Sequence, residues 1–169
     1  MKIFENFITK EKESEILNNI PKSLKKETKN RNNIYRYGNS KPYTLTYHIS
    51  NEIPKVFTTL GIEGFDSVTI NEYMLDQSLT FHVDHEFGGE QIVVLSLLGE
   101  AEIDFRNIKT KEIKNYLIKP LSLYIIEGDM RWNWQHRAIS KGLRYSIVFR
   151  KYTPIKNNNS LEEQIKILI

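Results

Sequence analysis

The chain has 169 residues, of which 40% are hydrophobic, and a formal net charge of +3 at pH 7. A chain of this size and composition is typical of one globular domain with a substantial core. It has no run of about 18 consecutive apolar residues and no apolar signal-peptide core, so membrane insertion is not expected. The absence of cysteine excludes disulfides, thiolate zinc sites and cysteine nucleophiles. The absence of cysteine is consistent with an intracellular protein, cytoplasmic or nuclear. A monomer is the expected oligomeric state.

The first predicted element is a helix over about residues 10–20, with Thr9 as its N-cap and Pro21 at its end. A basic stretch follows between Pro21 and Ser50, where seven Lys or Arg residues accompany a single acidic residue. Tyrosines are interleaved with these cations. Such a pattern suits a phosphate backbone with stacked bases, and a solvated surface loop is the alternative interpretation.

After a short helix near residues 54–60, the pattern changes to short strands rich in β-branched and aromatic residues. Strands are predicted over residues 68–75, 78–83, 91–98, 100–106, 113–118, 121–126 and 143–151. Their length and spacing favour a sandwich or jelly roll over a βαβ fold. A final helix is predicted in the tail, because Ser160 and Glu163 form a capping box.

The second predicted strand leads into a His-Val-Asp sequence over residues 82–84. Because side chains alternate along a strand, His82 and Asp84 are expected on the same face. One further imidazole would complete the set of two histidines and one carboxylate that holds iron in non-haem iron(II) oxygenases.

His136 is the preferred third ligand. It follows an aromatic-rich run over residues 131–135 whose large side chains can surround a buried site. The other candidates are less favourable, because His85 is expected on the opposite strand face and His48 lies in the basic stretch. A zinc hydrolase is the alternative metal site, but it gives no reason for the arginine pair described next.

Arg144 and Arg150 share one face of the last predicted strand. Arginine binds carboxylates bidentately and keeps its charge when buried. Asn71 and Tyr73 also lie two residues apart and add neutral hydrogen-bond donors. If the opposite face of the strand is the core, the arginines lie at the surface. If they are internal, metal ligands beside a carboxylate clamp imply an enzyme that uses iron and a dicarboxylate co-substrate.

Taken in order along the chain, these residues resemble the AlkB family of iron(II)- and 2-oxoglutarate-dependent dioxygenases, most closely its tRNA-associated branch. The segments that carry the resemblance are residues 71–73, 82–84, 95–97, 136 and 144–150. The resemblance implies a mainly β fold with flanking helices, a double-stranded β-helix or jelly roll. A single domain is expected, with the first helix and a substrate lid over about 1–50, the jelly-roll core over about 51–152 and a tail over about 153–169.

The resemblance also assigns roles to the residues that match the family. The expected catalytic metal ligands, which would hold Fe(II), are His82, Asp84 and His136. Residues expected to bind 2-oxoglutarate are Asn71, Tyr73, Arg144 and Arg150, the last of them near Asp84. Dioxygen is the other co-substrate. Two residues depart from the family pattern: Ser146 stands where Asn is usual, and Arg137 follows His136 where Gly is common.

The implied substrate is a nucleic acid, RNA or DNA, and the implied reaction is oxidative demethylation or hydroxylation of a modified base, as in RNA modification or DNA repair. Predicted substrate contacts are Glu86, Arg31, Arg36, Tyr35 and Tyr37, with the arginines on phosphates and a tyrosine on a base. A solvated loop glutamate is the alternative interpretation of Glu86. A protein-directed 2-oxoglutarate oxygenase and a non-catalytic nucleic-acid-binding protein of the same fold are the alternative functions.

Overall fold

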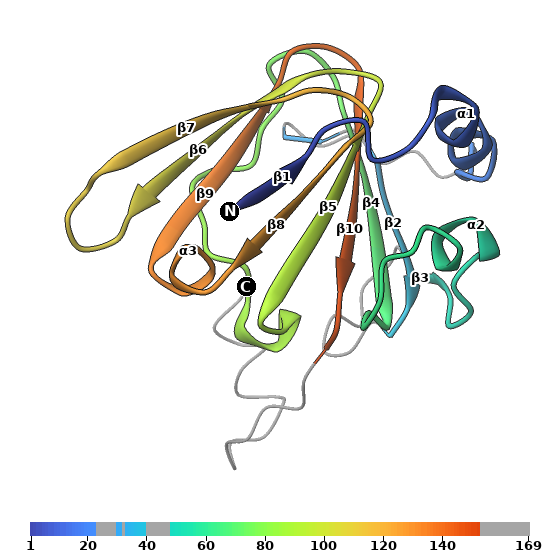
Figure 1. Cartoon of the computed structure of the whole chain (residues 1–169), viewed down its shortest axis with the longest axis horizontal. Helices are drawn as coiled ribbons and strands as arrows, with labels where there is room; N and C mark the ends of the chain where they lie inside the picture. Colours follow the sequence, from blue (N-terminus) through green and yellow to red (C-terminus); the bar gives the residue numbers. More distant parts are fainter. Residues whose placement is uncertain (23–29, 32, 40–47, 153–169) are drawn as a thin grey trace.

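A computed structural model describes residues 1–22, 30–31, 33–39 and 48–152. Within them, the strands form two sheets (Figure 1). The larger sheet has seven strands in the order β1-β8-β5-β10-β4-β2-β3, and the smaller has three in the order β7-β6-β9. Neighbouring strands are antiparallel, apart from β2 and β3. This mainly β arrangement confirms the predicted jelly-roll class.

The elements are short and follow one another without long helices. In chain order they are β1 (Lys2–Phe4), α1 (Lys10–Asn18), β2 (Asn33–Gly38), β3 (His48–Ser50), α2 (Lys55–Thr58), β4 (Ser67–Tyr73), the 3-10 turn η1 (Glu86–Gly88), β5 (Gln91–Leu97), β6 (Ala101–Asn107), β7 (Ile113–Ile118), β8 (Ser122–Glu127), α3 (Asp129–Trp132), β9 (Trp134–Ser140) and β10 (Arg144–Arg150). None of the helices in this part of the chain is long and apolar enough to cross a membrane.

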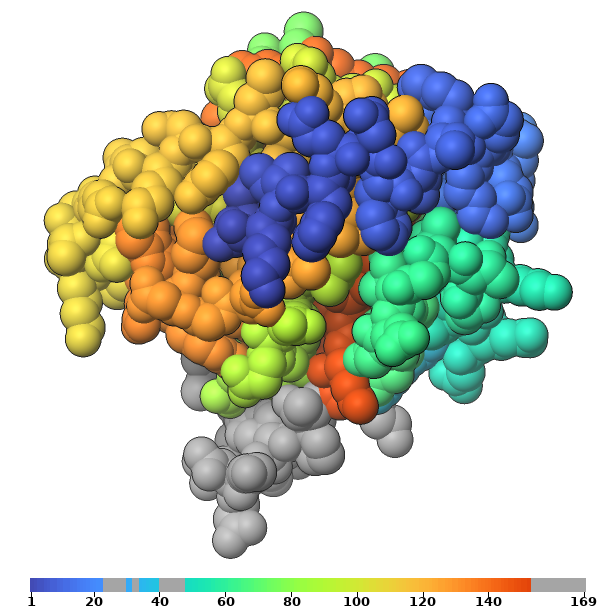
Figure 2. Space-filling model, in the orientation of Figure 1, coloured from blue at the N-terminus to red at the C-terminus, as the bar shows by residue number. Residues whose placement is uncertain are grey.

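The larger sheet has two chemically different faces because side chains alternate along each strand. On β10, Tyr145, Ile147 and Phe149 pack into an apolar cluster that also contains residues of α1 and α2. Figure 2 shows α1 (blue) and the region of α2 (teal) next to each other at the right of the molecule. The intervening residues of β10, Arg144 and Arg150 among them, line a cavity on the opposite side.

A second apolar cluster joins the two sheets. Ile92 and Val94 of β5 and Val148 of β10 pack with Phe105 of β6 and Trp134 of β9. Ile92, Val94 and Val148 also line the cavity, so this apolar cluster and the cavity lie next to each other between the two sheets. The arginine face of β10 is internal, so the surface alternative raised by the sequence does not apply.

Both predicted helices within the described residues are present. Thr9 is the N-cap of α1 and its side chain accepts a hydrogen bond from the Lys12 amide at 3.3 Å, and α2 lies inside the predicted 54–60 segment. The predicted capping box of Ser160 and Glu163 lies outside the described residues.

The strand predictions hold for β4, β5, β6, β7, β8 and β10 but fail around the candidate metal ligands. Residues 78–83 form no continuous strand; they make isolated bridges at Ser78 and at His82 to residues of β9. Strand β9 is not predicted by the sequence, because its inward positions carry His136 and Ala138 and so hide the apolar alternation. Strands β1, β2 and β3 are also absent from the prediction, and β2 lies in the segment predicted as a lid.

Gly38 ends β2 with a backbone φ of +77°, so its replacement by Ala is expected to destabilise the fold. A Cβ atom there would lie 2.2 Å from the Asp66 carbonyl oxygen. Left-handed strain costs about 1–2 kcal/mol and overpacking about 1–3 kcal/mol more, so Gly38→Ala should lower the free energy of unfolding by about 3 kcal/mol in urea denaturation.

Gly61→Ala is the matched control. Gly61 has a φ of +72° with nothing within 4 Å of its Cβ position, so only the backbone strain, about 1–2 kcal/mol, should be lost. Equal losses for the two variants would contradict the close packing of β2 against Asp66.

Candidate metal centre

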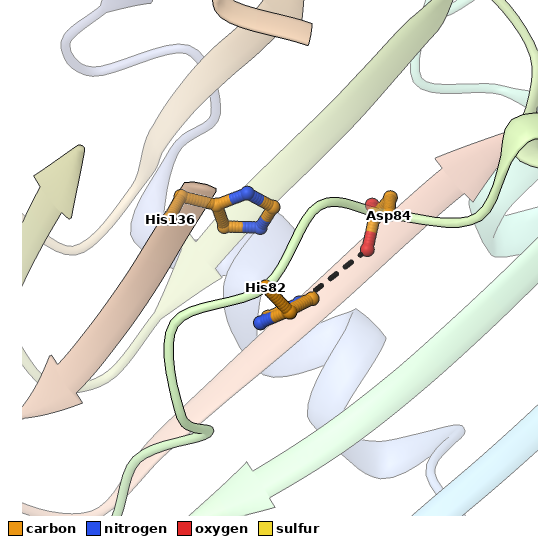
Figure 3. A group of neighbouring side chains, drawn as sticks. All are labelled: His82, Asp84 and His136. Atoms are coloured by element: carbon orange, nitrogen blue, oxygen red, sulfur yellow. Dashed lines mark ion pairs between the residues drawn. The ribbon is translucent and has the colours of Figure 1, made fainter. Parts of the chain in front are cut away.

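Three side chains converge between the two sheets (Figure 3). One ligand atom from each of His82, Asp84 and His136 lies within 4.8 Å of the others. The His82 Nε2 atom is 3.5 Å from Asp84 Oδ1, and the two imidazole centroids are 4.5 Å apart. His136 comes from β9, and the other two come from the irregular segment between β4 and η1. The structure thus brings together the three residues that the sequence predicts as metal ligands.

The His-Val-Asp spacing predicts that His82 and Asp84 meet because they share one face of a strand. In the structure they meet for a different reason. His82 is fastened to β9 by reciprocal backbone hydrogen bonds with His136, of 3.1 and 2.7 Å. Asp84 lies beyond this bridge, and its carboxylate accepts a hydrogen bond of 3.0 Å from Arg150 on β10. The two ligands of one segment are therefore held by different sheets, and Arg150 lies near Asp84 as expected.

The His82 ring is oriented by the main chain. Its Nδ1 atom lies 2.8 Å from the Thr80 carbonyl oxygen. Because a carbonyl can only accept, Nδ1 carries the proton of this hydrogen bond and, in the neutral ring, leaves the Nε2 lone pair available. Metal-binding histidines are commonly oriented in this way.

The electrostatics favour the ligand forms of Asp84 and His136. Burial alone would raise the pKa of Asp84, but the Arg150 guanidinium and a hydrogen bond from His82 hold it well below its usual range. Burial lowers the pKa of His136 to about 4. Since metal ligands must be deprotonated, both side chains are ready to bind a cation at neutral pH. For His82, burial lowers the pKa, but hydrogen bonds to Asp84 and Thr80 outweigh this and raise it.

The donor set suits a divalent transition metal. Two imidazoles and one carboxylate on one side of an ion are the facial arrangement of non-haem iron(II) sites. His85 is outside the cluster and stacks on Phe87, with ring centroids 3.6 Å apart. His48 bonds the Gly38 carbonyl.

A cavity of about 260 Å³ adjoins these ligands. Among the residues that the structure describes, its wall carries one carboxylate, Asp84, together with four arginines, which are Arg31, Arg36, Arg144 and Arg150. Both sheets contribute: β2, β4, β5, β8 and β10 from the larger one, and β9 from the smaller one. The excess of positive charge in a half-enclosed space suits an anionic ligand.

Arg144 is buried deep in this wall, with 1% of its surface exposed. Its Nε atom donates to the Ser96 hydroxyl at 2.8 Å. Its Nη2 atom is buried and has no hydrogen-bond partner among the described residues. A donor left unsatisfied on a buried charged group costs about 1–3 kcal/mol or more, and a ligand oxygen at this position would remove that cost.

Asn71 and Tyr73 lie beside Arg144 on the same cavity wall. Arg31 donates to the Asn71 Oδ1 atom at 2.9 Å. Because a guanidinium cannot accept, the amide oxygen must face Arg31, and the amide NH₂ remains as a donor. Burial raises the pKa of Tyr73, so its hydroxyl stays protonated and can also donate.

The structure places the five residues predicted to contact the substrate in three different environments. Tyr35 and Tyr37 are buried in the apolar cluster on the helix-covered face, with 2% and 6% exposure. This contradicts the prediction that one of them contacts a base, because a ring packed in the core has no free face for stacking. Arg31 and Arg36 line the cavity, and Glu86 is exposed in η1; their contacts with a substrate stay predictions.

The two departures from the family pattern occupy different environments. Ser146 lines the cavity, paired in register with Asn71 on one side and Ser96 on the other. Arg137 does not line the cavity; it donates to Asp104 at 2.8 Å and lies over Phe81. Only the serine can change contacts with a ligand in the cavity.

Two side chains that organise the site are not predicted by the sequence. Ser96 holds the buried Arg144, and its signal is only a small polar residue in a mostly apolar strand. Arg131 is 2% exposed and donates three hydrogen bonds to the segment that carries Asp84. Its signal is an arginine inside an aromatic run five positions before a ligand.

Comparisons with known proteins support the fold. No protein-family model matches the chain. It is 27% identical over 190 residues to Uncharacterized protein L905 of Acanthamoeba polyphaga mimivirus, an alignment that covers 97% of this chain and 86% of that protein. The solved structure of OsALKBH1 superposes with a TM-score of 0.68 at 14% identity, over 89% of this chain and 97% of that one. The chain therefore has an AlkB-like jelly-roll fold.

Replacement of a candidate ligand should abolish tight metal binding. Since the loss of residues that only orient ligands weakens metal binding by about 10–100-fold, His136→Ala should weaken Ni²⁺ binding at least about 100-fold. Isothermal titration calorimetry on tag-free protein measures this change. His85→Ala is the matched control and should leave the affinity unchanged; the reverse pattern would contradict the ligand assignment.

Proposed function

We propose that this protein is an iron(II)- and 2-oxoglutarate-dependent oxygenase. The observation that carries the proposal is one cavity lined both by the His82, Asp84 and His136 cluster and by the buried guanidinium of Arg144. A metal alone would not need a buried cation nearby, and a carboxylate ligand alone would not need the three metal donors. A co-substrate that contacts both explains why they share a cavity.

The residues fit iron. His82 and His136 offer imidazole nitrogens and Asp84 a carboxylate that is charged at neutral pH, which is the donor set of non-haem iron(II) oxygenases. Within the described residues, the metal cluster holds these three donors, which leaves room for exogenous ligands. A zinc hydrolase would also use such donors, but it provides no role for Arg144.

The residues also fit 2-oxoglutarate. Arg144, with support from Asn71 and Tyr73, would hold the carboxylate distant from the metal, and the Nη2 atom of Arg144 provides a donor that lacks a partner among the described residues. Arg150 lies at the metal end of the same strand, six residues away. The four arginines that line the cavity offset the two negative charges of this co-substrate.

When bound, iron and 2-oxoglutarate together with dioxygen would supply the oxidising chemistry that hydroxylates a C–H bond: one oxygen atom of dioxygen goes to the hydroxylated substrate and the other to succinate, and carbon dioxide is released. The protein positions these groups. Arg150 keeps Asp84 ionised, and the Thr80 carbonyl holds the proton of His82 on Nδ1. The apolar side chains of Ile92, Val94 and Ile126 line part of the cavity and limit water there. If an N-methyl carbon is hydroxylated, the product loses formaldehyde, which amounts to demethylation.

The proposed substrate is a modified base in RNA or DNA. Two arginines that follow the first helix, Arg31 and Arg36, line the cavity, and the surrounding basic stretch suits phosphates. A base must leave its stack to reach a centre between two sheets. Because Tyr35 and Tyr37 are buried, they give no support to base stacking, and charge and fold are what support this substrate class.

The test of the function is incubation of the protein with Fe(II), 2-oxoglutarate and a panel of methylated RNA and DNA oligonucleotides. Mass spectrometry should detect loss or hydroxylation of a methyl group, with succinate in equal amount. Succinate without any modified oligonucleotide would favour a different primary substrate, such as a polypeptide. No succinate at all would favour the non-catalytic alternative.

Arg144→Lys should weaken 2-oxoglutarate binding to the metal-loaded protein by about tenfold or more, because lysine keeps the charge but loses the bidentate geometry. Calorimetry with Mn²⁺ in place of iron measures binding without turnover. Arg137→Lys is the matched control, since Arg137 pairs with Asp104 away from the cavity. An unchanged affinity for the Arg144 variant would exclude its role as the clamp.

Arg36→Ala should weaken oligonucleotide binding and reduce the dependence of log Kd on log salt concentration by about one unit, as expected for the loss of one phosphate contact. Fluorescence anisotropy at several salt concentrations tests this. Lys109→Ala, at an exposed residue of the turn between β6 and β7, should have little effect. The same slope for Arg36→Ala and wild type would remove Arg36 from the nucleic-acid interface.

A further inference from the structure

Arg131 is an unusually placed cation. It belongs to the single-turn helix α3, and only 2% of its surface is exposed. Its guanidinium donates from Nε to the Gly89 carbonyl at 3.1 Å, from Nη1 to the Asp84 carbonyl at 2.8 Å and from Nη2 to the His85 carbonyl at 2.7 Å. All three acceptors belong to the segment that carries the candidate metal ligand Asp84.

The arrangement ties the burial of a charge to the shape of this segment. A buried guanidinium is tolerated when its donors are satisfied. The carbonyls of residues 84, 85 and 89 satisfy three of these donors only while they point toward one place. Any other course of the segment would leave part of a buried cation without hydrogen-bond partners, which is unfavourable.

Asp84 needs such a support more than the other two ligands. His136 lies in β9, and His82 is joined to it by two backbone hydrogen bonds. Asp84 lies outside every strand and helix. Its main chain receives the hydrogen bond from Arg131 and its carboxylate the one from Arg150, so backbone and side chain of the same residue are each held by an arginine.

We propose that Arg131 is a positioning residue for the metal centre, which acts by fixing the main chain at Asp84 so that the carboxylate meets the two imidazoles. This inference rests on the metal site of the proposed function. The proposal also gives a role to the aromatic-rich run before His136. The ring of Trp132 packs against the Arg131 guanidinium, with the ring centroid 4.1 Å from the guanidinium carbon.

Arg131→Lys is the first test, because lysine keeps the charge but cannot span three carbonyls with a planar fork. Titration of the tag-free protein with Ni²⁺ alone should show a Kd about 10–100-fold weaker, the usual effect of losing a residue that orients a metal ligand. Arg106→Lys is the matched control: Arg106 donates to the Gln135 side chain on the same small sheet, and its replacement should not change the Kd.

A double-mutant cycle separates positioning from a general effect on the fold. If Arg131 acts through Asp84, then Arg131→Lys in an Asp84→Ala background should change the residual Ni²⁺ affinity of the two histidines by less than about twofold. A full loss in that background as well, or no loss in the wild-type background, would overturn the proposal.

Thermal unfolding keeps the test decisive if the variant is less stable. Ligand binding raises the unfolding temperature to an extent that grows with affinity, so Ni²⁺ should raise the Tm of Arg131→Lys less than that of wild type, whatever the Tm without metal. If neither Arg131→Lys nor Arg131→Gln folds, the residue serves the fold and the proposal fails. The metal site of the proposed function is tested separately. If the wild-type protein binds Ni²⁺ and His136→Ala does not, that site is supported whatever the Arg131 variants do.

Discussion

Burial of arginine side chains between two sheets is the constraint on which the rest of this structure depends. The alternation of β10 sends Tyr145 and Ile147 into the apolar core and Arg144 and Arg150 into the space between the sheets. A buried guanidinium is unfavourable unless anions or acceptors surround it. Arg150 has Asp84 for this purpose, whereas Arg144 retains a buried donor without a partner among the described residues. The cavity therefore suits an anion that the described residues do not supply.

The chemistry-bearing residues are predictable where they lie on regular strands. Arg144 and Arg150, like Asn71 and Tyr73, have even spacing, and a period of two places them on one face whatever the rest of the fold does. The burial of that face cannot be read from the strand itself, because both faces carry large side chains. It becomes visible only with the second sheet, which covers the arginine face.

Prediction fails where tertiary contacts replace local pattern. Residues 78–83 have the composition of a strand, yet they pair with β9 only through isolated bridges. The ligands His82 and Asp84 meet because Thr80, Arg131 and Arg150 hold them, and none of these contacts has a sequence period. The basic stretch likewise contains β2. The alternation of β2 turns its tyrosines inward to the core and Arg36 toward the cavity, so a segment whose composition suits nucleic-acid binding is partly internal structure.

Whether the metal ligands and the arginine-lined cavity serve one co-substrate is tested most directly by anaerobic visible absorption of the protein loaded with Fe(II) and titrated with 2-oxoglutarate. Chelation of the metal by the co-substrate produces a charge-transfer band that neither component gives alone. We expect a saturable band with one equivalent of 2-oxoglutarate per protein. Tight Fe(II) binding without such a band, at saturating 2-oxoglutarate, would show that the two parts of the site do not bind the same molecule.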